Sequence, residues 1–341
     1  MEGLRIMVAV SVLDLVPVVE GQEAGDALRN AVALVRHAEA LGYRRYWVAE
    51  HHNMVGIASA ATSVVIGHLA AATSRIRVGA GGVMLPNHAP LIIAEQFGTL
   101  EALFPGRIDL GLGRAPGTDQ LTMRAMRRDP RAASEFPQDV LEIQAYFEPA
   151  AQDQPVQAVP GAGLRVPLWI LGSSLFGAQL AAELGLPYAF ASHFAPADLM
   201  DALAIYRERF KPSAQAARPY AMPCINVIAA ATDAEARHLA TSLQQRFTDM
   251  VRGRRGKLKP PIADIDGYWS MQEKAHVMQM LRYAFIGSPE TIRRELSGFL
   301  DATGADEVMV TAPIFDHQAR LTSYALLAEV AAGLQARRSA A

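Results

Sequence analysis

The sequence predicts an α/β fold in which eight parallel strands, each followed by a helix, close into a (β/α)8 TIM barrel. Short apolar runs recur along the chain, each followed by a polar or glycine-rich turn and then by an amphipathic helical pattern. Eight such units are present, a number more typical of a closed barrel than of an open sheet. With 341 residues, 51% of them hydrophobic, the chain is long enough for a single barrel domain over residues 1–341.

The predicted strands are apolar runs that end at glycine, proline or polar positions. In a barrel, the residues just past the carboxyl ends of the strands lie at the mouth, where ligands bind. We expect strands at residues 4–11, 44–50, 75–84, 107–112, 167–172, 187–192, 222–230 and 306–312.

The predicted helices alternate with these strands, and two of them begin with recognisable signals. Thr232 and Glu235 have the spacing of a capping box, and Ser288 precedes Pro289 at a first helical position. We expect helices at residues 26–41, 59–72, 90–103, 174–184, 196–210, 233–250, 289–302 and 317–336.

Two connections are longer than the strand–helix alternation requires. Residues 115–165 form an expected insertion after the fourth strand, and residues 251–288 form an expected mobile lid region after the seventh. Long loops on barrels commonly cover the catalytic face. The second connection contains the basic run RGRRGKLK, which indicates a solvated flexible loop or a contact with a phosphate-bearing partner, and mobility is expected within residues 252–262.

Composition and charge argue against several classes of function. A net charge of −2 gives no long-range attraction to nucleic acid or to an anionic membrane. The single cysteine, Cys224, excludes intrachain disulfides and thiolate metal clusters, and is typical of inert packing in a cytoplasmic protein. No run reaches the roughly 18 uninterrupted apolar residues of a membrane span, and Asp14 interrupts the amino-terminal apolar run.

The second predicted strand ends in VAEHHN, which places Glu50, His51 and His52 at the barrel mouth. Adjacent strand residues point to opposite faces, so only one of the two histidines can face a ligand. A histidine here suits proton transfer near neutral pH, with the carboxylate as its orienting partner. The alternative is a strand end capped by hydrogen-bonded histidines. No HExxH pattern accompanies the pair, so we expect no metal site.

The fourth and fifth strands end in residues suited to an anion. Arg114 follows the glycines of GRIDLGLG and offers paired donors to a phosphate, unless it forms a structural salt bridge. Gly172, Ser173, Ser174 and Gly177 open the helix after the fifth strand, whose free amides favour an anion. A serine that only caps the helix is the simpler alternative.

The third strand ends in GAGGVMLPNH, where Gly81 and Gly82 leave almost no side chain. Glycine inside a strand is unfavourable unless another group approaches the backbone closely. That group is either a flat aromatic ligand or the crowded interior of the barrel.

Several motifs, taken together and in order, resemble those of the bacterial luciferase-like flavin monooxygenases, most closely the single-subunit oxidoreductases of that family. The resemblance runs along nearly the whole chain, through WVAEHHN, RVGAGGVMLPNHAPLIIAEQFGTLEALFPGRIDLGLGRAPGTD, PLWILGSS with GLPYAFASHF, and GSPETIRRELSGFLDATGADEVMV. It implies a barrel that binds FMN at its mouth, with the phosphate held by Arg114 and residues 172–177. It also implies a non-proline cis peptide at Gly81–Gly82 beside the flavin, and proton transfer assisted by His51 with support from Glu50 and His52.

Two departures from bacterial luciferase bear on the chemistry. Gly113 stands where luciferase has a cysteine beside the flavin, so light emission is not implied. Gly177 stands where luciferase has a threonine, which leaves the backbone amides and Ser173 or Ser174 to bind the phosphate.

The resemblance implies a two-component monooxygenase. A separate NAD(P)H flavin reductase would supply reduced FMN, which reacts with O₂ to give a flavin C4a-hydroperoxide that oxygenates a small organic substrate. The alternatives are an F420-dependent hydride-transfer enzyme and a flavin-binding protein without catalysis. The family favours a homodimer, and the expected apolar substrate pocket comprises Leu13, Val16, Met54, Met84 and Phe194.

Overall fold

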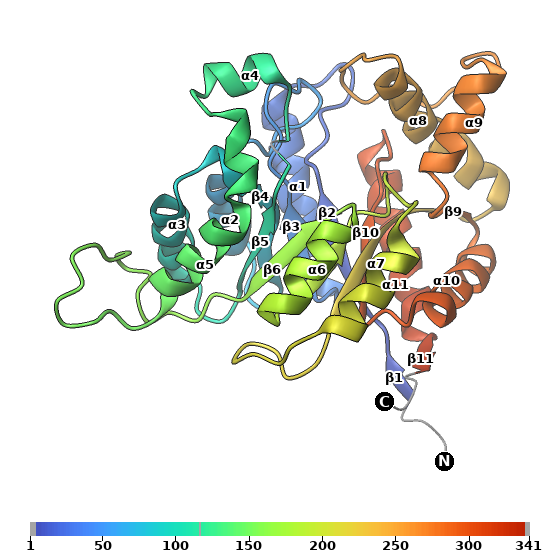
Figure 1. Ribbon diagram of the computed structural model, residues 1–341. Coiled ribbons are helices and arrows are strands. Elements are labelled where there is room, and N and C mark those ends of the chain that lie inside the picture. Colours follow the sequence, from blue (N-terminus) through green and yellow to red (C-terminus); the bar gives the residue numbers. More distant parts are fainter. Residues whose placement is uncertain (1–4, 116, 338–341) are drawn as a thin grey trace.

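The structure, a computed structural model, describes residues 5–115 and 117–337. Its centre is a closed parallel barrel, in which the strands follow one another in chain order and the last strand pairs with the first (Figure 1). The predicted (β/α)8 TIM barrel is therefore confirmed. The barrel strands are β2 (Ala9–Asp14), β3 (Arg45–Val48), β4 (Arg77–Met84), β5 (Ile108–Gly113), β6 (Leu168–Gly172), β7 (Tyr188–Phe190), β8 (Ala221–Ala229) and β10 (Glu307–Thr311).

Helices surround this barrel and alternate with its strands. They are α1 (Ala24–Ala40), α2 (Thr62–Ala71), α3 (Pro90–Leu103), α5 (Phe136–Phe147), α6 (Leu175–Leu184), α7 (Leu199–Arg209), α10 (Pro289–Thr303) and α11 (His317–Ala332). Across the described residues, no helix is long and apolar enough to cross a membrane.

Further elements lie at the two ends of the barrel. Figure 1 shows α4, α8 and α9 together at one end and the β1–β11 pair at the other. They are β1 (Arg5–Met7), η1 (Leu85–Asn87), α4 (Gln120–Ala125), η2 (Pro130–Ser134), α8 (Asp233–Val251), α9 (Met271–Met280), β9 (Ala284–Gly287), which pairs with β8, and β11 (Gln335–Arg337).

Some predicted boundaries were wrong. The expected strand 4–11 is two strands: β1 pairs with β11 outside the barrel, and the barrel strand β2 continues to Asp14. Nothing in the sequence between them, such as glycine or proline, marks this break. The connection 115–165 contains α5, whose buried residues recur at helical spacing, and the connection 251–288 contains α9 and β9.

The helix starts follow the sequence signals only in part. Thr232 accepts a hydrogen bond from the Glu235 amide at 3.2 Å, as the capping spacing predicts. Ser288 occupies the cap position of α10 but makes no side-chain capping bond. Instead, the Asp233 carboxylate accepts the Ser288 amide at 2.6 Å, which joins the start of α8 to the start of α10.

The interior of the barrel is filled, which confines ligands to its mouth. Trp47 and Trp169 pack edge to face, with ring centroids 5.1 Å apart. Beside them, buried Arg45 donates to Asp109 at 2.8 Å and to Glu307 at 3.1 Å, linking β3, β5 and β10. Both carboxylates are fully buried, so they need this cation for their charges to be compensated.

Candidate active site

A cavity of about 660 Å³ lies at the carboxyl ends of the barrel strands. Its wall includes residues at the ends of β4, β5 and β6 and a series of residues from α8. Ligand pockets commonly measure about 300–1,000 Å³ and occur at this face of a barrel. The cavity is therefore the candidate active site.

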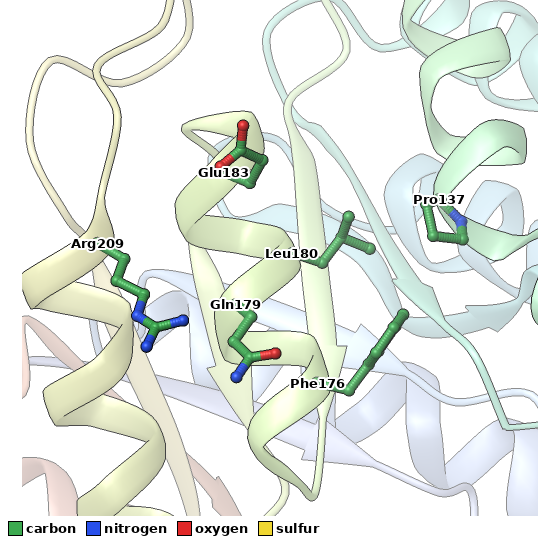
Figure 2. A pocket seen from close by; sticks show the side chains of 6 residues that line it. All are labelled: Pro137, Phe176, Gln179, Leu180, Glu183 and Arg209. Atoms are coloured by element: carbon green, nitrogen blue, oxygen red, sulfur yellow. The ribbon is translucent and has the colours of Figure 1, made fainter.

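A smaller hollow of about 290 Å³ lies on the outer surface. Figure 2 shows Phe176 and Leu180 pointing from α6 toward Pro137 on α5, with Arg209 of α7 nearby. Of its six lining residues, only Phe176 also lines the large cavity. We therefore do not place the active site in this hollow.

His51 is the histidine of the pair that lines the cavity. Burial, reinforced by the positive charge of Arg246, lowers the pKa of His51 to about 4. The imidazole is therefore neutral near pH 7. Its Nδ1 atom is buried and has no hydrogen-bond partner among the described residues, while the residue as a whole is half-buried and lines the cavity.

Glu50 and His52 do not line the cavity and instead form a hydrogen-bonded cluster behind it. The buried Glu50 carboxylate lies 2.6 Å from His52 Nε2 and 2.9 Å from His88 Nε2, and it accepts the Met84 amide at 2.9 Å. Burial acts to raise the pKa of Glu50, but hydrogen bonds, those of His88 foremost, hold it below its usual value. Glu50 thus fixes the loop after β3 to the end of β4.

Gly81 and Gly82 line the cavity, and the peptide bond between them is cis, as the sequence resemblance implied. A Cβ on Gly82 would lie 2.8 Å from the Gly111 carbonyl oxygen, and a Cβ on Gly79 would lie 2.4 Å from that of Asp109. Crowding by the neighbouring strand β5 therefore accounts for the glycines at positions 79 and 82. The same crowding leaves a cavity floor of backbone, suited to a flat ligand.

The structure places Arg114 in the cavity wall without an ion-pair partner among the described residues. Its guanidinium stacks 4.0 Å from the centroid of the Phe176 ring. The salt bridge considered from the sequence is thus not formed, and the donors of Arg114 remain available to an anion.

The turn between β6 and α6 lies in the same wall. A Cβ on Gly177 would lie 3.3 Å from the Gly172 Cα, so the turn is tight. Ser174 is the cap residue of α6, yet its side chain makes no capping bond. Ser173 and Ser174 both line the cavity beside the unpaired amides of the helix start, which is the arrangement expected of an anion site.

Sequence reasoning missed three polar residues of the cavity. His193 follows β7, and burial, followed by the charges of His51 and Arg246, lowers its pKa to about 3. Asn226 of β8 donates from Nδ2 to the His193 carbonyl oxygen at 2.6 Å. His193 was findable as a polar residue at a strand end, whereas the helical pattern of α8 did not indicate that Arg246 faces the barrel.

The expected apolar lining is largely present. Leu13, Met54, Met84 and Phe194 line the cavity, but Val16 does not. Val16 is buried in the core beyond the end of β2, with a positive φ of 48°. No group of histidine, cysteine and carboxylate side chains in residues 5–115 and 117–337 is arranged to hold a metal ion.

Comparison with known proteins identifies the family of the chain. The family model described as luciferase-like monooxygenase matches residues 8–307. The chain belongs to the luciferase-like monooxygenase family. An Escherichia coli (strain K12) protein named luciferase-like monooxygenase is 55% identical over 324 residues, covering 95% of this chain and 97% of its own. The crystal structure of apo-MsnO8 is 36% identical, covers 95% of this chain and 98% of its own, and superposes with a TM-score of 0.85.

More distant solved structures share the fold of this luciferase-like chain with different cofactors. The oxygenating constituent of a Pseudomonas putida 3,6-diketocamphane monooxygenase, solved with FMN, is 15% identical, covers 96% of this chain and 99% of its own, and has a TM-score of 0.74. An F420-dependent secondary alcohol dehydrogenase, solved with an F420–acetone adduct, is 16% identical, covers 96% of this chain and 99% of its own, and has a TM-score of 0.69. Structures with this fold thus bind FMN or F420.

Proposed function

We propose that this protein is an FMN-dependent monooxygenase that uses reduced FMN and O₂ to oxygenate a small organic substrate. The observation that carries the proposal is the layout of the cavity. An end suited to an anion, a floor of glycine backbone and a neutral, half-buried histidine line the same space. These features match in turn the phosphate, the flat ring and the proton requirements of a flavin.

The residues present fit FMN. Arg114 and the α6 start, with the hydroxyls of Ser173 and Ser174, would hold the phosphate, since Arg114 has no ion pair in the part of the chain that the structure describes and Ser174 makes no capping bond. The backbone at Gly81–Gly82 would lie against the ring. The apolar wall around this floor would exclude water from the reacting atoms.

When bound, reduced FMN supplies the two electrons that allow one oxygen atom of O₂ to enter the substrate while the other leaves as water. The protein positions the reactants and manages protons. His51 can exchange a proton with a ligand in the cavity because burial keeps the ring neutral. Glu50 and His52 act through the loop that carries His51.

The proposal extends to the partners of the protein. An NAD(P)H flavin reductase would supply reduced FMN in the cytoplasm, and the functional unit would be a homodimer. The F420-dependent enzyme is the second candidate, because an F420-dependent dehydrogenase shares the fold.

The test begins with cofactor choice and oxygen reactivity. The protein is titrated with FMN and with F420, then loaded anaerobically with reduced FMN and mixed with oxygenated buffer while flavin absorbance is followed. We expect tighter binding of FMN, reoxidation kinetics unlike those of free reduced FMN, and incorporation of one ¹⁸O atom from ¹⁸O₂ in a substrate screen. A preference for F420 would favour hydride transfer, and reoxidation identical to that of free flavin would favour a non-catalytic flavin-binding protein.

A further inference from the structure

The cavity carries more positive charge than one phosphate group requires. Six cationic side chains line it, against a single carboxylate, Asp249, which pairs with Lys259 at 2.7 Å. The cations are Arg114, Arg246, Arg254, Arg255, Lys257 and Arg320. A cavity lined predominantly by one sign of charge attracts ligands of the opposite sign.

Half of these cations are already neutralised by the protein. Arg255 pairs with Asp119 at 2.7 Å, and Lys257 pairs with Glu23 at 2.9 Å. Arg320 is buried and pairs with Asp14 at 2.8 Å. Among the described residues, Arg114, Arg246 and Arg254 are left without an ion pair.

Arg246 stands apart from the other two unpaired arginines. Arg254 is exposed at the rim, and Arg114 lies beside the α6 start, where the FMN phosphate is proposed to bind. Arg246 comes from α8 and lines the cavity together with His51 and His193, and its charge helps to lower the pKa of both histidines. Burial, with the charge of Arg320, also lowers the pKa of Arg246 itself. An uncompensated charge in such surroundings is unfavourable until an anion binds.

Apart from Arg320 and Asp249, which are paired with Asp14 and Lys259, the cavity around Arg246 is lined by neutral and apolar side chains. His51 and His193 are uncharged near pH 7, and the apolar side chains of Leu243, Phe247 and Phe194 line the same cavity. One guanidinium offers two parallel donors, which match the two oxygens of a carboxylate.

We propose that Arg246 binds the carboxylate of the substrate, which is a small organic acid whose apolar part lies against the wall formed by α8 and Phe194. This inference rests on the proposed function only in calling the ligand a substrate. The binding itself needs no turnover and is tested separately.

The test compares organic acids with their uncharged counterparts. Phenylacetate, 3-phenylpropionate, 4-phenylbutyrate and 5-phenylvalerate, and the primary amide of each, are titrated into the FMN-loaded protein by calorimetry. We expect at least one acid to bind at least tenfold more tightly than its amide, because a desolvated guanidinium–carboxylate pair is worth about 10–100-fold in affinity. If no acid of the series is preferred over its amide, the proposal is wrong.

Variants of α8 assign the preference to one residue. Arg246→Gln should remove the preference for the acid while leaving the amide affinity within about twofold, and Arg246→Lys should restore only part of it. Arg237→Gln, an exposed position on the same helix, is the matched control and should retain the preference. A preference that survives in Arg246→Gln, or that is lost in the rim variant Arg254→Gln instead, would overturn the assignment.

The other possible occupant is the reduced flavin ring, which can carry a negative charge. If Arg246→Gln weakens reduced FMN at least tenfold more than oxidised FMN and leaves the acid preference intact, Arg246 serves the cofactor and the proposal is wrong. If the acids bind as expected but no ¹⁸O is incorporated, the monooxygenase function fails while the anion site stands. Oxygenation confined to uncharged substrates would mean that the monooxygenase function stands while the anion site fails.

Discussion

At the scale of single residues, burial decides which of two adjacent histidines can act. His51 faces the cavity with its pKa lowered to about 4, whereas His52 is turned toward the Glu50 carboxylate 2.6 Å away. The pKa is lowered mainly because a charged imidazole in the cavity would lose its hydration. The two neighbours therefore have different tasks: one meets the ligand and the other holds the loop.

Replacing His51 by alanine should leave FMN binding nearly unchanged and slow oxygenation by about 10²–10⁴-fold, the usual scale of general acid–base assistance. FMN affinity is measured by fluorescence quenching, and oxygenation by ¹⁸O incorporation into a substrate found in the screen. His68→Ala, an exposed position on α2, is the control. Because the pKa of His51 is about 4, its protonation should not limit the rate between pH 5 and 8. Undiminished turnover in His51→Ala would remove this residue from the mechanism.

Arg114 should determine the preference for FMN over riboflavin, which lacks the phosphate. Arg114→Ala should weaken FMN binding by about 10–100-fold, since hydrogen bonds to charged groups contribute about 1.5–3 kcal/mol, and should leave riboflavin binding almost unchanged. Arg165→Ala, exposed just before β6, is the matched control. An equal loss for both flavins would mean that Arg114 shapes the site without contacting the phosphate.

At the scale of elements, the segment that follows α8 covers the cavity through a few defined contacts. Leu258 forms a β-bridge with Val19: its amide donates to the carbonyl of Val18, and its carbonyl accepts the amide of Glu20. Arg255 pairs with Asp119 at the start of α4. Gly56 packs directly beneath, where an added Cβ would lie 2.2 Å from the Gly256 carbonyl oxygen. Mobility within residues 252–262 stays a prediction, and these contacts are where it can be tested.

Gly56→Ala should displace this segment and speed its cleavage by trypsin after the basic residues of 252–257. Overpacking typically costs about 1–3 kcal/mol, which corresponds to about a 5–150-fold increase in the population of the open segment. The rate is measured by limited proteolysis with mass spectrometry. Unchanged cleavage would show that the contact at Gly256 does not hold the segment.

The control for this substitution is Gly298→Ala in α10. A Cβ at Gly298 would meet no atom within 4 Å. Because glycine is unfavourable inside a helix, this variant should gain about 0.5–1 kcal/mol in the free energy of unfolding. Its cleavage within residues 252–257 should not change.

At the scale of the whole molecule, buried charges join strands that are far apart in the sequence. Arg45 on β3 pairs with Asp109 on β5 and with Glu307 on β10, across the interior of the barrel. Asp109 also pairs with Arg77 at 2.7 Å, and Glu307 accepts the Tyr220 hydroxyl at 2.8 Å. Such a network is favourable only when every member is satisfied.

Arg45→Met should lower the free energy of unfolding by about 3–5 kcal/mol, because it leaves buried carboxylates without their shared cation. The neighbouring Arg44 is the matched control: its side chain is 49% exposed and lies 3.7 Å from Glu307. Arg44→Met should cost less than about 1 kcal/mol. Both values come from urea unfolding, and equal losses in the two variants would contradict the role given to burial.

The sequence by itself determined the barrel and the position of much of the site. The strand–helix alternation is local, and the carboxyl ends of parallel strands meet at one mouth, so Glu50, His51, Arg114 and residues 172–177 could be assigned to that end. The cis peptide at Gly81–Gly82 was implied by the family resemblance and is present in the structure. Local pattern was insufficient where no turn residue marked a break, as between β1 and β2.

Only the tertiary structure decided which side chains meet. Glu50 contacts His88 and His52 and leaves His51 to the cavity. Arg246 approaches His51 from α8, although the two residues are nearly two hundred positions apart in the chain. Arg45 joins β3, β5 and β10. Spacing along a strand or helix fixes the face of a residue but not its partner on another element. The fold gives Arg255, Lys257 and Arg320 carboxylate partners and gives Arg246 none among the described residues. The expectation that an organic acid binds at Arg246 follows from this difference.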